Sequence, residues 1–374
     1  MRRIEISQLT IEGFKSIRKL TDFEPRAINV FIGQNGAGKS NFIGFFRFLA
    51  NMLSGTGNLA EFTGKQGGAS EILFDGPETT PVLKASITLT SQKGKNQYAF
   101  RLSHASADTF IFNDEQFRFL SASMNDSTAK WTSLGSGHKE AQMIKIDEQL
   151  PYAKTQFVIK DFLQRLIVFQ FHNTTQKSPI RETKADVENG WFLMEDGRNL
   201  AAVLFQLQHN ESAVYRKIIR VLRQIVPFFD DFFLTEEYGK VYLRWKEKKS
   251  SKIFVATHAS DGMLRAMALV TLLSLPQGRL PDVIFIDEPE LGLHPSAIGA
   301  ICSLIHGASE YSQLFIATQN SDMLNEFSAD DIVVVTRNDR ESEFTRFSET
   351  QLSSWLDEYT LSELWNKNVL GGKP

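Results

Sequence analysis

The chain has 374 residues, a formal net charge of −3 and a single cysteine. This length suffices for two or three compact lobes, and the charge excludes a protein coated with basic residues for nucleic acid, although it permits a local basic patch. The lone Cys302 excludes an internal disulfide and argues against a Cys-based zinc site. Because the sequence has no apolar leader and no apolar run long enough to cross a bilayer, we expect a cytoplasmic protein without a membrane segment.

The first predicted elements lead into a glycine-rich octet. Residues 4–17 have the pattern of a strand pair that turns near Gly13, and Ile28–Ile32 is a continuous apolar strand. The octet at 33–40, GQNGAGKS, follows this strand directly, and a helix is predicted from Lys39 to about Leu53. A chance glycine-rich turn would lack this order of strand, loop and helix, which is typical of a phosphate-binding loop.

The octet matches the pattern G-x-x-x-x-G-K-[ST] in full. Its glycines let backbone N–H groups converge on a phosphate, and the helix N-terminus adds partial positive charge. Lys39 can reach the outer phosphates, and Ser40 can ligate magnesium. The sequence therefore predicts binding of ATP and Mg²⁺. The candidate nucleotide-binding residues here are Gly33, Asn35, Gly36, Gly38, Lys39, Ser40 and Asn41.

Antiparallel strands are predicted next, followed by a mixed segment. The strand candidates lie at 72–74, 82–90, 97–102 and 109–120, and the Ser-, Gly- and Lys-rich residues 121–145 predict a surface excursion. Beyond them we predict helices at 152–166, 199–208 and 211–226, a polar loop at 177–189, and strands at 167–171, 231–236, 241–245 and 253–256. The many phenylalanines occur in short groups, which favours core packing over an exposed patch.

Two further apolar runs, at 283–286 and 314–317, suit parallel strands that are buried on both faces. The first is followed by Asp287 and Glu288. Beside a phosphate loop, the first acid can hold magnesium through water, and the second can orient or deprotonate the attacking water. Glu290 is an alternative base, but Glu288 directly follows the metal acid. Gln319 follows the second run, where a polar side chain can sense the terminal phosphate.

The segment Ser260-Asp261-Gly262 opens an apolar helix predicted at 263–275. Ser260 is a good N-cap, Asp261 suits the first turn, and Gly262 permits close approach of another backbone. The pattern is compatible with a capped core helix or with a second phosphate-binding helix terminus.

In this order the motifs resemble the ATPase head shared by ABC transporters and the SMC, RecF and OLD-like proteins. The strings GFKSI at 13–17, DEPELGLHP at 287–295 and LSELW at 361–365 are most similar to stand-alone bacterial AAA-family ATPases of the RecF/OLD-like group in anti-phage defence. The resemblance implies an α/β fold, an ABC-type P-loop ATPase head with a mixed central sheet and an antiparallel β subdomain. The ATPase core would be 1–120 and 255–374, and 121–254 would be a mixed, mainly helical insertion in place of a coiled coil.

The resemblance also implies roles for single residues. Ser260 and Gly262 would belong to a signature motif that contacts ATP held by the other protomer, and Leu291–Pro295 would cross the dimer interface. Gln319 stands where many relatives have a switch histidine, a departure that bears on the rate of hydrolysis. The other implied assignments are Lys15, Lys39 and Ser40 for the nucleotide, Ser40 and Asp287 for magnesium, Glu288 for catalysis, and Gln66 or Gln170 for the magnesium-contacting glutamine.

These features together predict an ATP-hydrolysing switch that forms an ATP-sandwiched homodimer or higher oligomer and controls a separate effector, such as a nuclease, in anti-phage defence. The interval between Lys39 and Asp287 is too short for an SMC-type coiled coil, and the tail after Gln319 lacks the acidic cluster of a Toprim nuclease. A RecF-like DNA-repair ATPase and a transporter subunit are the alternatives. The lysine-rich run Lys246–Lys252 is either a contact for nucleic acid or a solvated turn.

Overall fold

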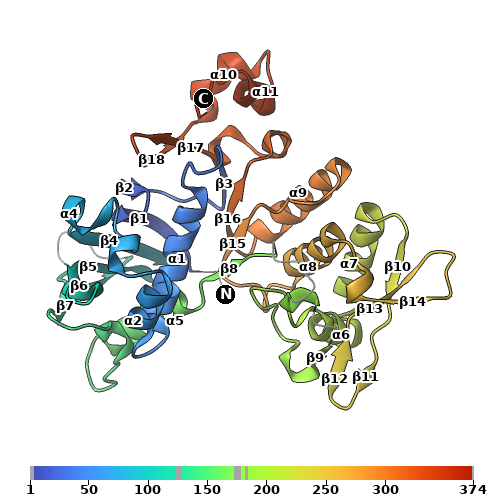
Figure 1. Cartoon of the computed structure of the whole chain (residues 1–374), viewed down its shortest axis with the longest axis horizontal. Helices are drawn as coiled ribbons and strands as arrows, with labels where there is room; N and C mark the ends of the chain where they lie inside the picture. The colour runs from blue at the N-terminus through green and yellow to red at the C-terminus, as the bar shows by residue number, and fades with distance from the viewer. Residues whose placement is uncertain (1–3, 123–128, 172–177, 182–183, 373–374) are drawn as a thin grey trace. The chain divides into compact units, whose positions relative to one another are not determined.

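The computed structural model describes residues 4–122, 129–171, 178–181 and 184–372 (Figure 1). The chain forms two compact units, of which the first comprises Met1–Ile167 and Ser328–Pro374 and the second comprises Val168–Phe327. Parts of the predicted surface excursion (123–128) and of the predicted polar loop (177 and 182–183) lie outside the described residues. The division into an ATPase core and an insertion at 121–254 stays a prediction. The two compact units show which parts of the chain pack together, and they do not show which parts belong to the ATPase core.

The first unit contains an antiparallel sheet of order β2-β1-β4-β5-β6-β7 (Figure 1). Its strands alternate buried and exposed side chains, as predicted for half-exposed antiparallel strands. The strands are β1 (Glu5–Phe14), β2 (Ile17–Phe23), β4 (Val82–Ser91), β5 (Gly94–Ala105), β6 (Thr109–Ser121) and β7 (Thr132–Gly135). Because β7 and the buried Met143 fall inside 121–145, that segment is not solely a surface excursion.

Two details of this sheet correct the sequence predictions. The turn between β1 and β2 lies at Lys15 and Ser16 rather than at Gly13, and Lys15 closes it with a left-handed φ of 48°. Gly13 stays within β1, where a Cβ would stand 2.9 Å from the carbonyl oxygen of Val82. The expected strand at 72–74 is instead the end of a short helix, α3 (Ala69–Ile72), followed by a single bridge from Leu73 to Phe14.

The predicted strand before the octet is β3 (Ile28–Ile32), which is buried at every position. It runs parallel to β17 (Ile332–Asn338), which pairs antiparallel with β18 (Glu341–Arg346). The helix α1 (Lys39–Ser54) follows the octet. Aromatic rings pack this helix against two strands. The ring centroids of Phe42 and Phe31 of β3 are 4.5 Å apart, and those of Phe45 and Phe14 of β1 are 5.3 Å apart. The unit also contains α2 (Asn58–Lys65), α4 (Gly76–Thr79), α5 (Ala153–Gln164), α10 (Glu349–Leu356) and α11 (Leu361–Asn366).

The second unit is built around two parallel strands, β15 (Val283–Asp287) and β16 (Gln313–Thr318), whose residues are all buried. The short strand β8 (Ile167–Phe169) is the other neighbour of β15. The helices are α6 (Leu200–Asn210), α7 (Ser212–Ile225), α8 (Asp261–Ser274) and α9 (Pro295–Ser309). The predicted parallel strands and the helices predicted at 199–208, 211–226 and 263–275 are therefore present near the expected residues.

Two three-stranded antiparallel sheets complete the second unit (Figure 1). One contains β10 (Phe229–Phe232), β13 (Arg244–Glu247) and β14 (Ile253–Val255), and the other contains β9 (Lys184–Asp186), β11 (Glu236–Glu237) and β12 (Lys240–Tyr242). The expected polar loop at 177–189 thus includes a strand, and the expected strand at 231–236 is divided between two sheets. Local alternation gave no sign of these pairings, because β9 is only three residues long and its partner β12 is far away in sequence.

Candidate functional site

The octet at 33–40 forms a tight loop between β3 and α1. Gly36 and Gly38 have φ values of 78° and 116°, a region that glycine enters without strain. The Lys39 side chain is buried, and its ammonium donates hydrogen bonds to the carbonyls of Gly33, at 2.5 Å, and Gln34, at 3.0 Å. Ser40 is exposed in the first turn of α1. A cation and a helix N-terminus on a glycine loop suit a bound phosphate.

Ser16 and Ser342, which are far apart in sequence, form hydrogen bonds that support this loop. The Ser342 hydroxyl is 2.6 Å from the carbonyl of Ala37 and 2.7 Å from the hydroxyl of Ser16. Since a carbonyl can only accept, Ser342 donates to Ala37, and Ser16 supplies the proton of the second contact. A Cβ on Gly38 would stand 1.9 Å from Ser342 Oγ, so only glycine fits there. Sequence reasoning missed Ser342, because nothing in β18 marks it as a neighbour of the octet.

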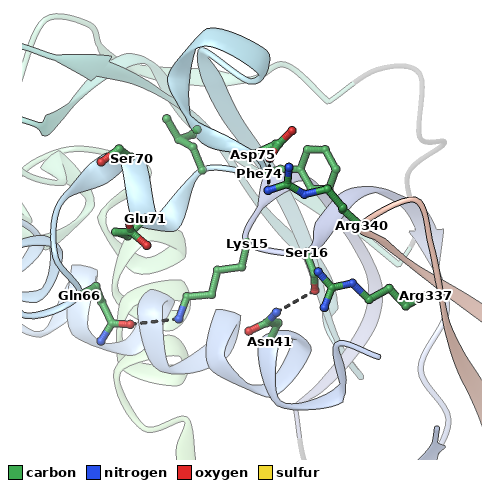
Figure 2. Close-up of a pocket in the computed structure, with 12 residues that line it drawn as sticks. Lys15, Ser16, Asn41, Gln66, Ser70, Glu71, Phe74, Asp75, Arg337 and Arg340 are labelled. Atoms are coloured by element: carbon green, nitrogen blue, oxygen red, sulfur yellow. Dashed lines mark hydrogen bonds and ion pairs between the residues drawn. The ribbon is translucent and has the colours of Figure 1, made fainter. Parts of the chain in front are cut away.

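Ser16 also lines a polar cavity of about 600 Å³ (Figure 2). Lys15 donates to Gln66 at 3.0 Å, and Asn41 donates to Ser16 at 2.7 Å. Burial, with a smaller contribution from Arg47, lowers the pKa of Lys15. The lining cations are Lys15, Arg337 and Arg340, and the lining acids are Glu71 and Asp75. Its size is that of a small-molecule site, and its excess of cations favours an anionic ligand.

Two arginines from the β17–β18 hairpin reach this region. Arg337 donates to the carbonyl of Gly36 at 3.0 Å, and Arg340 forms an ion pair of 2.5 Å with Asp75 at the cavity (Figure 2). Neither arginine belongs to a motif that the sequence revealed. The octet is therefore framed by residues from both ends of the chain.

The acidic end of β15 brings three predicted site residues together in the second unit. Asp287 is 9% exposed, and Glu288 follows it with a left-handed φ of 47°. The backbone N–H of Glu288 donates to Ala317 of β16 at 2.8 Å, which fixes the turn. The side-chain amide of Gln319 donates to the Glu288 carboxylate. The predicted base and the residue at the switch position are therefore direct partners.

Glu290, the alternative base, is half-buried, as Glu288 is, but has different partners. One of its carboxylate oxygens accepts from the Thr318 hydroxyl at 2.6 Å and from the backbone of Gln319 at 3.2 Å. The other oxygen is buried, without a hydrogen-bond partner among the residues that the structure describes. Burial raises the pKa of Glu290 above its ordinary value, and the nearby Glu288 raises it further. Glu290 therefore joins the ends of β15 and β16, whereas the Glu288 carboxylate accepts from the side chain of Gln319.

The predicted signature residues form the N-terminus of α8. Ser260 is exposed, and its hydroxyl accepts from the N–H of Met263 at 3.3 Å. Gly262 lies against the loop after the acids, and Arg265 donates to two carbonyls at 3.0 Å each, those of Leu291 in that loop and of Phe171 after β8. The helix start, the acidic loop and the segment after β8 are thus joined by short contacts.

The structure separates the two candidate glutamines. Gln66 caps α2 in the first unit and binds Lys15. Gln170 directly follows β8 in the second unit, and its neighbour Phe171 lines a small pocket with Asp287 and Glu288. Gln170 is therefore next in sequence to a residue that lines the same small pocket as the predicted metal acid. Both assignments stay predictions.

The lysine run at 246–252 begins within β13 and continues through the turn that leads to β14, whereas the sequence predicted the whole run to lie between two strands. Lys248 donates to the carbonyl of Pro227 at 2.6 Å, and Lys246 lies 5.2 Å from the Phe233 ring. Within the described ranges, no helix is long and apolar enough to cross a membrane. No group of three or more His, Cys, Asp or Glu side chains there could hold a metal ion.

Comparison with known proteins places this geometry in context. The profile of a family described as "AAA domain, putative AbiEii toxin, Type IV TA system" matches residues 28–324. No curated protein sequence matches the chain. A crystal structure of an Smc head bound to the C-winged helix domain of ScpA is similar, with 16% identity, a TM-score of 0.57, and coverage of 92% of this chain and 99% of that one.

A second similar structure is the Smc head domain with an extended coiled coil, bound to the C-terminal domain of ScpA derived from Pyrococcus furiosus. It is 15% identical, with a TM-score of 0.55, and the match covers 95% of this chain and 99% of that one. At such identities the likeness shows the fold alone. It confirms the predicted fold class, the ABC-type P-loop ATPase head.

Proposed function

Because the chain belongs to the AbiEii-type AAA family, whose profile matches most of its length, we propose that it is an ATP-hydrolysing molecular switch. The observation that carries this proposal is the loop at 33–40, which holds the buried Lys39 ammonium on its carbonyls at the N-terminus of α1. Phosphate oxygens can replace these carbonyls as acceptors of the Lys39 ammonium. The adjoining cavity, rich in cations, is large enough for the rest of the nucleotide.

The residues present are of the right type for magnesium. Ser40 offers a hydroxyl and Asp287 a carboxylate, the hard oxygen ligands that Mg²⁺ prefers, and phosphate and water would supply the others. The ion would neutralise phosphate charge when bound. We assign Glu288 to orient and deprotonate the attacking water and Gln319 to hold the Glu288 carboxylate in place. Of the two candidate glutamines, we prefer Gln170 for the magnesium contact, because Phe171 beside it lines a small pocket with Asp287 and Glu288.

The exposed N-terminus of α8 supports a closing dimer. Ser260 and Gly262 would meet ATP held by a second copy, since a helix N-terminus with an exposed hydroxyl is a ready anion site. The test is sedimentation of Glu288→Gln with and without Mg·ATP, with Lys39→Ala as the matched control that should stay monomeric. A Glu288→Gln protein that binds ATP but remains a monomer would contradict the proposal.

We further propose that the switch acts in the cytoplasm on a separately encoded effector in anti-phage defence. The family description names a toxin of a toxin–antitoxin system, and the two similar Smc heads each bind a domain of a partner protein. Co-purification of the ATP-locked Glu288→Gln protein with the products of neighbouring genes tests this role. Capture by Glu288→Gln but not by Lys39→Ala would support it, and equal capture by both would argue against ATP control.

A second candidate function, ATP-dependent binding of nucleic acid, rests on the charge of α7. This helix exposes four cations and contains no acid. The cations are Arg216, Lys217, Arg220 and Arg223. The turn after β13 adds lysines near the end of α7, since Lys248 contacts Pro227. Salt-dependent binding of DNA or RNA that is lost in Arg216→Glu/Arg220→Glu would support this candidate, and no binding at low salt would exclude it.

A further inference from the structure

Arg181 forms hydrogen bonds and an ion pair with the turn that contains Ser260, the predicted signature serine. Its Nη1 donates to the carbonyls of Ala256 and Ala259 at 3.0 Å each, and its Nη2 forms an ion pair of 2.7 Å with Asp261. Ser260 stands between two of these three partners. The Arg181 side chain is only 10% exposed, whereas that of Asp261 is 58% exposed. The largely buried guanidinium of Arg181 thus fixes the exposed turn at Ser260.

The backbone of Arg181 is itself held in place. Residues Pro179–Arg181 form a single 3₁₀ turn, and the N–H of Arg181 donates to the carbonyl of Ser178 at 3.0 Å. Ile180 is 1% exposed. Its side chain packs so close to Gly197 that a Cβ built on Gly197 would stand 3.2 Å from the Ile180 side chain. The planar fork of an arginine on a fixed backbone sets the direction of its donors, which a flexible lysine would not do.

The contacts of Arg181 have two consequences for the turn. Its two carbonyl acceptors point toward the guanidinium, and the turn is therefore held in the conformation in which Ser260 caps α8. The ion pair also compensates the charge of Asp261, a carboxylate beside Ser260 that would otherwise repel an approaching triphosphate.

We propose that Arg181 is a positioning residue that prepares the Ser260 turn to engage the phosphates of ATP bound by a second copy of the chain. This inference rests on the proposed closing dimer. It assigns a role to a residue outside every motif visible in the sequence. The role differs from ordinary stabilisation, because it acts on the partner's nucleotide and not on the nucleotide bound by the same chain.

The first test compares Glu288→Gln with Glu288→Gln/Arg181→Ala. We expect the ATP affinity of the monomer to stay close to that of the parent, its melting temperature to fall without loss of the fold, and ATP-dependent dimerisation to weaken about tenfold or more, about 1.4 kcal/mol. Arg181→Lys, which keeps the charge but not the fork, should give an intermediate defect. Arg198→Ala, which removes the exposed ion pair with Asp196, is the matched control and should dimerise normally.

The outcomes separate this inference from the proposed function. A parent that never dimerises contradicts the closing dimer itself. A parent that dimerises while the Arg181→Ala variant dimerises equally well overturns the role of Arg181. A loss of dimerisation that merely follows a lost fold, with ATP binding lost in both arginine variants, also overturns it.

The second test uses mixed dimers in the presence of intact Glu288. In a mixture of Arg181→Ala and Lys39→Ala proteins, one composite site combines an intact phosphate loop with an intact Ser260 turn, so ATPase activity should return. A mixture of wild type with the Arg181→Ala/Lys39→Ala double variant contains no such site in its mixed dimers, which should add no activity to that of the wild-type dimers present. Activity gained in the second mixture alone, or in neither, would overturn the inference.

Discussion

Gly262 and Gly292 lie so close together that a Cβ built on Gly262 would stand 2.1 Å from the carbonyl oxygen of Gly292. The neighbour is backbone, and no side-chain rotation can relieve the collision. The start of α8 therefore rests directly on the loop that follows the acids of β15. Arg265 strengthens this contact through the carbonyl of Leu291, at 3.0 Å. The signature turn and the acidic loop behave as one packed element.

Gly262→Ala should separate these two segments. We expect a loss of stability of about 1–3 kcal/mol, the typical cost of overpacking, together with loss of ATP-dependent dimerisation. Thermal melts and sedimentation would measure both effects. Gly307→Ala in α9 is the matched control, because a Cβ there meets no atom within 4 Å. The control should be unchanged or more stable by up to about 1 kcal/mol, and a variant at 262 that behaves like it would contradict the packing argument.

Ser342→Ala should weaken ATP binding without preventing folding. The change removes the hydroxyl that donates to the Ala37 carbonyl, which leaves the octet freer to move. One such bond contributes about 1 kcal/mol, so we expect about a fivefold loss of ATP affinity by calorimetry. Ser303→Ala removes a hydroxyl that donates to a carbonyl in an exposed turn of α9 and serves as the control. Equal affinities for both variants would show that the octet needs no support from β18.

Gln319→Ala should lower kcat with little change in KM. Its amide orients the Glu288 carboxylate, and an unrestrained base transfers protons less efficiently. If the two residues act as a unit, Gln319→Ala in a Glu288→Gln background should add almost no further loss. Steady-state ATPase assays of the two single variants and the double variant measure this coupling. Fully additive losses would show that Gln319 acts independently of Glu288.

Glu290→Gln should change how stability depends on pH. Burial, and then the charge of Glu288, raise the pKa of Glu290 in the folded chain, so the native state binds a proton more tightly than the unfolded state does. The stability due to this proton is present below the unfolded value, near pH 4, and is lost as pH rises through the folded pKa. The variant lacks this loss, so the melting temperature of Glu290→Gln relative to that of the wild type should rise as pH increases.

Melting curves at a series of pH values between about 4 and 8 would check this prediction, with the unfolded pKa of about 4.3 as the starting point. Glu310→Gln, which removes an exposed acid at the end of α9, is the matched control. A difference between Glu290→Gln and wild type that is constant across this range would mean that Glu290 does not titrate differently on folding.

The sequence was most informative where local pattern and chemistry coincide. The octet, its strand and its helix were predicted almost to the residue, because glycine spacing and a continuous apolar run are local signals. The parallel strands at 283–287 and 313–318 were found for the same reason. The expected strand at 72–74 failed, because three apolar residues fit a buried turn as well as a strand.

The supporting residues could not be found in this way. Ser342 supports the octet from across the fold, and Arg181 reaches the signature turn from a segment with no motif. Their roles depend on long-range pairing, which one sequence does not display. The pairing of Gln319 with Glu288 lies between these cases, since both residues end neighbouring parallel strands and could have been expected to meet.

The left-handed backbone conformation of Glu288 lowers the stability of the folded chain. Its φ of 47° lies in a region that costs a residue with a side chain about 1–3 kcal/mol and that glycine enters freely. Selection for thermal stability alone would therefore favour glycine at this position, even though glycine would delete the proposed base. A screen of variants that survive heating should enrich Glu288→Gly and deplete ATPase activity together. The residue that we assign as the base would then be one at which selection for resistance to heat and selection for turnover oppose each other.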